Sequence, residues 1–121
     1  MTGKADRTGD YLRHMLEAIG RIRTYTLGLD LAAFEQDIRT QDAVIRNLEV
    51  LGEAARNVQV NDPAFVAEHP DIPWAMAYRM RNALSHGYAD IDLGTVWNTV
   101  RNDLPPLERR LVALIPDRPA G

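Results

Sequence analysis

The sequence contains no cysteine, no long uncharged apolar run and no excess of positive charge. Without cysteine there is no disulfide, thiolate metal site or cysteine nucleophile, which fits a reducing compartment. No segment resembles a membrane span or a signal peptide, so we expect a cytoplasmic protein without membrane contact. The 14 basic and 17 acidic residues give a net charge of −3. Because the overall field does not attract nucleic acid, RNA contact would need a local basic patch.

Several catalytic motifs are also missing from the chain. The sequence has no phosphate-binding glycine loop and no pair of histidines one helical turn apart, as zinc proteases have. Ser85 stands beside His86 but lacks the flanking glycines of a nucleophile elbow. The acidic residues are scattered rather than clustered as in a magnesium site. We therefore predict neither a metal site nor a cofactor.

Apolar residues recur at helical spacing in the first half of the chain. The first stripe predicts a helix from about Thr8 to Thr26, followed by a short helical turn at 31–34. A second long stripe, from Val44 to Val58, predicts a helix with Thr40 as its cap. Asp62 precedes a proline and is expected to cap a short segment that ends near Val66.

Two further helices are expected in the second half. One begins near Pro73, with Asp71 as a candidate cap, and ends at Gly87. The other is capped by Asp92, and its apolar register continues through two prolines, which predicts one kinked helix. Its stripe consists of Leu93, Val96, Val100, Leu104, Leu107, Leu111 and Leu114.

These patterns together predict an all-α protein. We expect an antiparallel four-helix bundle with short extra helices and a kinked C-terminal helix. The chain forms one domain, residues 1–121, with a frayed tail at residues 116–121. Trp74 and Tyr78 form an aromatic row that can belong to the core or can stack on bases, and we expect the core. Glu53 follows a glycine within the second helix and can pair with an arginine.

The residues with the most distinctive chemistry are Arg81, Asn82, His86 and Tyr88. Arginine neutralises phosphate through a planar fork, and histidine transfers protons near neutral pH. On an ideal helix, Arg81 and His86 point about 140° apart, so they converge only if the helix loosens near Gly87. Taken as a pair without further context, they are more typical of a surface arginine and of a histidine that interacts with a helix end. Tyr88 by itself is more typical of an aromatic side chain that anchors the loop.

If the two residues do converge, they suit RNA cleavage by the ribose 2′-hydroxyl. His86 would act as base or acid, and Arg81 would stabilise the charge on the phosphoryl oxygens. Asn82 would orient a phosphate or the imidazole. One chain supplies one histidine, so a two-fold dimer would provide both base and acid. The last two helices carry more leucine, valine and tryptophan residues than one small bundle needs to bury, which also predicts a symmetric interface.

Most of the chain, from the second long helix onward, resembles the HepT-type branch of HEPN ribonucleases. The resemblance rests on the order of several short blocks as well as on the Arg–His pattern. The blocks are Asp42 to Leu48, Gly52 to Ala55, Ile72-Pro73-Trp74, Met80-Arg81-Asn82, His86-x-Tyr88, Asp92-Leu93 and Val96-Trp97.

The resemblance implies a helical homodimer that cleaves RNA without metal at a shared cleft. It implies that Arg81 and His86 are catalytic, with Asn82 in support. It also implies a toxin whose cognate nucleotidyltransferase antitoxin, MntA, silences it by adding AMP to Tyr88. The alternative is a non-catalytic HEPN subunit that binds a nucleotide or presents a substrate to such a nucleotidyltransferase. The intact Arg–His–Tyr set favours the nuclease.

Overall fold

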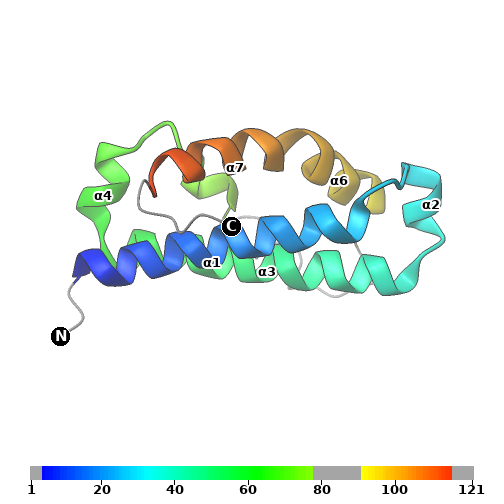
Figure 1. Ribbon diagram of the computed structural model, residues 1–121, viewed down its shortest axis with the longest axis horizontal. Coiled ribbons are helices and arrows are strands. Elements are labelled where there is room, and N and C mark those ends of the chain that lie inside the picture. The colour runs from blue at the N-terminus through cyan, green and yellow to red at the C-terminus, as the bar shows by residue number, and fades with distance from the viewer. Residues whose placement is uncertain (1–3, 78–90, 116–121) are drawn as a thin grey trace.

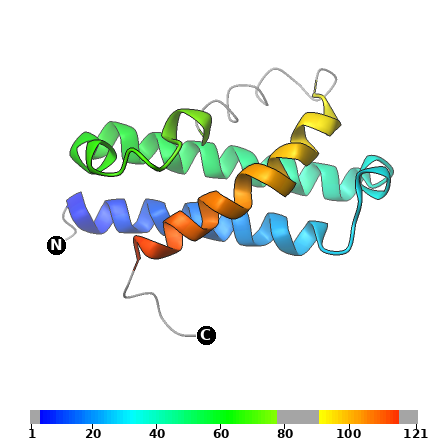
Figure 2. The same ribbon diagram turned by 90° about the horizontal axis from the view of Figure 1, so that it is seen from above.

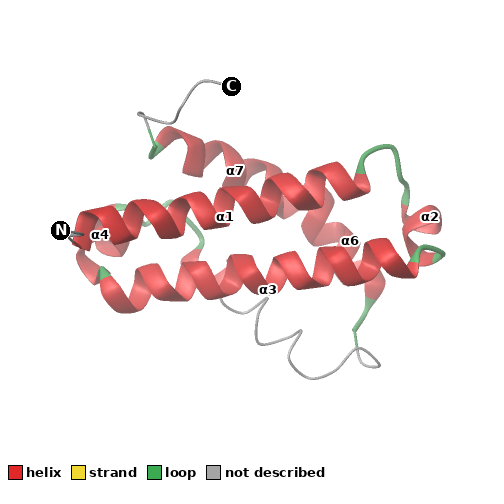
Figure 3. Cartoon of the chain, turned by 60° about the horizontal axis from the view of Figure 1, so that its bottom comes forward, coloured by secondary structure: helices red, strands yellow, loops and turns green. Residues whose placement is uncertain are grey.

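The computed structural model describes residues 4–77 and 91–115, and these residues form helices without any strand (Figure 1). Two long helices, α1 (Lys4–Thr26) and α3 (Ile38–Asn61), lie side by side and antiparallel (Figure 3). The short helix α2 (Leu31–Glu35) joins them at one end, and α4 (Pro63–Glu68) follows α3 at the other. Residues 74–77 are helical again. The all-α bundle with short extra helices is confirmed.

The last long element is a helix in three parts: α6 (Leu93–Asn98), the π-helical turn η2 (Thr99–Asp103) and α7 (Leu104–Ala113). It crosses α1 and α3 obliquely (Figure 2). The Leu104 N–H donates to the Thr99 carbonyl, five residues back. This wider turn lies just before Pro105 and Pro106, whose rings would clash with the carbonyls of a regular helix. The prolines therefore lie within one continuous helix, as predicted, and the irregularity beside them is a π-helical turn.

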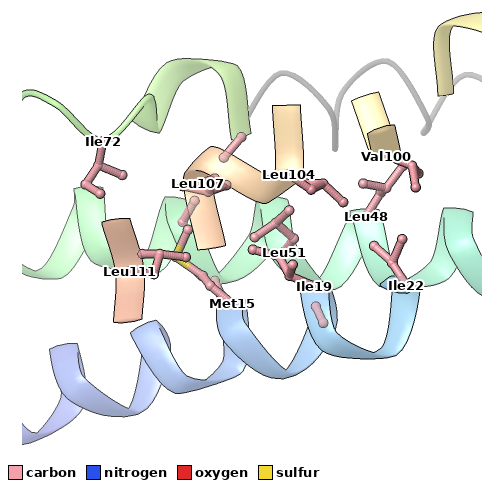
Figure 4. Close-up of a cluster of buried hydrophobic side chains, with 14 of the residues drawn as sticks. Met15, Ile19, Ile22, Leu48, Leu51, Ile72, Val100, Leu104, Leu107 and Leu111 are labelled. Atoms are coloured by element: carbon pink, nitrogen blue, oxygen red, sulfur yellow. The ribbon is translucent and has the colours of Figure 1, made fainter. Parts of the chain in front are cut away.

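A single apolar core fills the space between these three long elements (Figure 4). The predicted stripes supply it, and most of their side chains are almost completely buried. Its largest contributors include Met15, Ile19, Ile22, Leu48, Leu51, Leu104, Leu107 and Leu111. Phe34 from α2 is fully buried and lies 5.1 Å from the ring centroid of Trp97. The short helix α2 is therefore part of the bundle rather than a surface loop.

Three predicted helix ends differ from the structure. The first helix begins at Lys4 rather than near Thr8. The cap of α3 is Asp37 rather than Thr40, because Asp37 accepts hydrogen bonds from the Thr40 hydroxyl and amide. These bonds hold the pKa of Asp37 below its ordinary value, so the capping charge is lost only as pH falls through that lowered pKa. Pro73, rather than Asp71, precedes the helix at 74–77, since its carbonyl accepts from Ala77.

Two predicted caps are confirmed, and one of them also joins distant helices. Asp92 caps α6, and Asp62 caps α4 by accepting from the Phe65 amide at 3.3 Å. The second oxygen of Asp62 accepts from the Thr8 hydroxyl at 2.7 Å. Both Thr8 and Asp62 are buried. This carboxylate therefore holds the N-terminal part of α1 against the α3–α4 junction.

We expect Asp62→Ala to lower the free energy of unfolding by about 2 kcal/mol, because it removes both a helix cap and the buried hydrogen bond from the Thr8 hydroxyl. The matched control is Asp30→Ala, which removes the exposed cap of α2 alone. That change should cost about 1 kcal/mol. Urea unfolding followed by circular dichroism measures both values. Equal losses in the two variants would show that the Thr8–Asp62 contact adds no stability.

Candidate functional site

The four residues predicted to carry the chemistry, Arg81, Asn82, His86 and Tyr88, lie outside the described residues. The same is true of the proposed helix end at Gly87. Their convergence therefore stays a prediction. The structure does define what holds the chain on both sides of this segment.

On the N-terminal side, the chain is anchored by Trp74. Its side chain is only 4% exposed, and its indole N–H donates to the His69 carbonyl at 3.1 Å. The ring of Phe65 meets Trp74 edge-on, with the centroids 6.2 Å apart. Ala77, the last described residue of this helix, is fully buried. Trp74 is thus a core residue, as expected, and not a platform for stacking bases.

On the C-terminal side, the chain is fixed again at Ile91 and Asp92. Ile91 packs against the core. One oxygen of Asp92 accepts from the Gly94 amide at 2.9 Å, and the other accepts from the Thr95 hydroxyl at 3.0 Å. The bundle therefore holds both flanks of the motif through buried apolar contacts and a helix cap.

A pocket of about 430 Å³ lies between α1 and α3. His14 from α1 lines it together with Arg46, Glu49, Glu53 and Asn57 from α3. Arg46 and Glu49 approach to 3.9 Å. The sequence pattern did not reveal this grouping, because the lining residues on α3 lie more than 30 positions beyond His14. Within residues 4–77 and 91–115, His, Asp and Glu nowhere gather as three or more potential metal ligands.

A second pocket, of about 310 Å³, separates the C-terminal end of α1 from the π-helical turn and α7. Arg23, Arg101 and Glu108 line it along with several apolar side chains. Arg23 and Glu108 form an ion pair. Arg101 lies over the Trp97 ring, 5.6 Å from its centroid. Sequence spacing offers no signal for this site, since the paired residues are 85 positions apart.

Most apolar residues of the last helix pack within the chain, although Val112 is 39% exposed, and the rest of the expected surplus falls on residues after Ala77 that lie outside the described ones. Val96, Val100, Leu104, Leu107 and Leu111 are buried within the chain, and Leu93, Trp97 and Leu114 pack against the same core. This helix therefore supplies no argument for a symmetric interface. No helix among the described residues is long and apolar enough to cross a membrane.

The family model described as "Ribonuclease HepT-like" matches residues 15–114. Among curated proteins, the chain is 42% identical over 105 residues to "Probable ribonuclease HepT" of Thermococcus cleftensis, covering 87% of this chain and 93% of that protein. It is 34% identical over 107 residues to a protein of Methanocaldococcus jannaschii named as a putative RNase, covering 88% and 86% of the two chains.

Another Methanocaldococcus jannaschii protein is named as a gamma-glutamylcyclotransferase and putative RNase. It is 35% identical over 105 residues, which cover 87% of this chain and 46% of that longer protein. No solved structure matches. The family match spans both anchors, Trp74 and Asp92, and the whole segment between them. The chain therefore belongs to the HepT-like ribonuclease family.

Proposed function

We propose that this protein is a metal-independent endoribonuclease and the toxin of a HepT/MntA pair. The observation that carries the proposal is the intact Arg81–His86–Tyr88 set in a chain of the HepT-like ribonuclease family. RNA is the substrate that a ribonuclease of this kind would cleave. The local charges of the motif would then attract it, since the net charge of −3 does not.

The proposed reaction begins with removal of the ribose 2′-hydroxyl proton by a neutral His86. The 2′-oxygen attacks the adjacent phosphorus, and the bond to the 5′-oxygen breaks. A protonated histidine gives its proton to the departing oxygen, which leaves a 2′,3′-cyclic phosphate. Arg81 stabilises the negative charge on the phosphoryl oxygens, and Asn82 orients the phosphate or the imidazole.

This reaction needs no cation, because imidazole and guanidinium groups perform the proton transfers and the charge stabilisation. We therefore expect purified protein to cleave RNA in excess EDTA and to leave cyclic phosphate ends. Gel analysis with 3′-end phosphatase treatment distinguishes these ends from 3′-hydroxyls. Loss of cleavage in EDTA with recovery on adding magnesium would contradict the mechanism.

The proposed active form is a homodimer, because one chain provides only one histidine in the motif. A two-fold axis near Arg81 would bring two Arg–His sets to one cleft. We expect light scattering to give twice the chain mass of 13.6 kDa under assay conditions. Dilution below the dimer dissociation constant should lower the specific activity. A monomer with full activity would exclude the two-histidine scheme.

A further inference from the structure

The pocket between α1 and the π-helical turn has three features that together indicate the chemistry of the molecule it would bind. Its floor is apolar and is formed by Ile19, Ile22, Val100 and Leu104. Figure 4 shows these side chains between α1 and the C-terminal helix. Gly28 lies at its edge with φ of +80°, and there is open space where a side chain would begin. The volume of about 310 Å³ is within the range of small-molecule sites.

The second feature is a pair of backbone carbonyls without helical donors. In the π-helical turn, Leu104 donates to Thr99. The carbonyls of Val100 and Arg101 would next receive N–H groups from positions 105 and 106, but both are proline and have none. Val100 and Arg101 both line the pocket. Since unpaired main-chain carbonyls attract donors, a ligand with N–H groups is favoured beside them.

The third feature is positive charge at the rim. Arg23 and Arg101 line the pocket, and Glu108 neutralises Arg23 through their ion pair. Arg101 is exposed and, among the residues that the structure describes, forms no ion pair. Two guanidinium groups against one carboxylate leave an excess of one positive charge. Arginine beside an aromatic ring is well suited to bind phosphate.

We propose that this pocket binds one nucleotide unit. The base lies on the apolar floor, its N–H groups donate to the carbonyls of Val100 and Arg101, and its phosphate lies at Arg101. Adenine, guanine and cytosine carry amino donors that suit those carbonyls. The choice of a nucleotide rests on the proposed ribonuclease function, and the unit can belong to RNA or be free.

The first experiment identifies the ligand and its place. The intact protein is titrated with adenosine 5′-monophosphate, adenosine and ribose 5-phosphate while NMR signals are followed. We expect the nucleotide to shift the Gly28 amide and the Arg101 side-chain signals. Adenosine and ribose 5-phosphate should each bind about tenfold more weakly, because each lacks one set of contacts. Shifts confined to other regions, or none at all, would overturn the proposal.

The second experiment uses matched charge variants. Arg101→Gln removes the rim charge, while Arg109→Gln makes the same change at an exposed arginine of α7 that does not line the pocket. We expect nucleotide affinity to fall about tenfold in the first variant alone. Both arginines are exposed, so both variants should fold, and thermal unfolding checks this. Equal affinities in the two variants would overturn the proposal.

A third experiment, with RNA as the ligand, distinguishes a nucleotide unit within RNA from a free nucleotide. In a His86→Ala background, which prevents cleavage, RNA affinity is measured over a range of salt. If the pocket holds an RNA phosphate, Arg101→Gln should reduce the salt slope by about 0.7 and Arg109→Gln should not. An unchanged slope with lost mononucleotide binding identifies a free nucleotide as the occupant.

The RNA-cleavage assay on the wild-type protein separates the two proposals. If the protein cleaves RNA but its pocket binds no nucleotide, only the proposal for the pocket is contradicted. Nucleotide binding at Arg101 by a protein that cleaves no RNA would defeat the ribonuclease proposal alone.

Discussion

Replacing His86 with alanine is expected to reduce RNA cleavage by about 10²- to 10⁴-fold, because it removes the group that moves the proton. Arg81→Ala should reduce cleavage by about 10²- to 10³-fold through lost charge stabilisation. The helical fold should survive both changes. Neither change touches the buried anchor Trp74 or the helix cap Asp92 on the two sides of the motif.

Matched controls separate a catalytic role from a general loss of charge or histidine. His14→Ala and Arg109→Ala make the same substitutions at exposed sites outside the motif. Single-turnover cleavage of a labelled RNA gives the rates, and circular dichroism verifies the fold. When expressed without an antitoxin, the wild-type protein and both controls should arrest growth, whereas the motif variants should not. Folded motif variants that cleave RNA at the wild-type rate would remove the catalytic assignment.

Attaching AMP to Tyr88 is expected to suppress cleavage almost completely. The phenol lies two residues beyond His86 in the chain. An added phosphodiester would place negative charge and bulk where an RNA phosphate must bind, and it could also occupy Arg81. Tyr88→Phe removes the attachment point but not the proposed catalytic groups. This variant should therefore cleave RNA and resist neutralisation by the partner nucleotidyltransferase.

The matched control for Tyr88 is Tyr25→Phe, since Tyr25 is an exposed tyrosine on α1. Mass spectrometry of the protein co-expressed with its cognate nucleotidyltransferase should find AMP on wild type and on Tyr25→Phe, and not on Tyr88→Phe. An adduct at another residue would refute the switch while leaving the nuclease assignment intact. Continued nucleotidyl transfer by a complex that cleaves no RNA would instead support a non-catalytic HEPN subunit.

The helical periods and two of the caps were predictable from local sequence. The stripes through Leu48 and Leu107 had to face a core because exposed rows of that length are costly. Asp62 and Asp92 precede their helices with side chains that can accept the first free amides, which is a local property of the chain. Family membership followed from the order of short motifs, which needs no coordinates.

Where two local structures were both possible, the sequence pattern predicted less well which of them would form. Asp37 and Thr40 are both good caps three residues apart, and the sequence pattern placed the helix start at the wrong one. The aspartate takes the cap because its carboxylate accepts from both the amide and the hydroxyl of Thr40. Likewise, the prolines after Leu104 predicted a kink, but they did not predict that the backbone would form a π-helical turn just before them.

By itself, the sequence determined the all-α class, the family and the residues of the proposed chemistry, because each depends on spacing along the chain. Only the tertiary structure decided which distant residues meet. Thr8 reaches Asp62, His14 shares a pocket with Glu53, and Arg23 pairs with Glu108. Helix crossing and packing set these contacts, and residues so far apart in the chain carry no periodic signal that would reveal them.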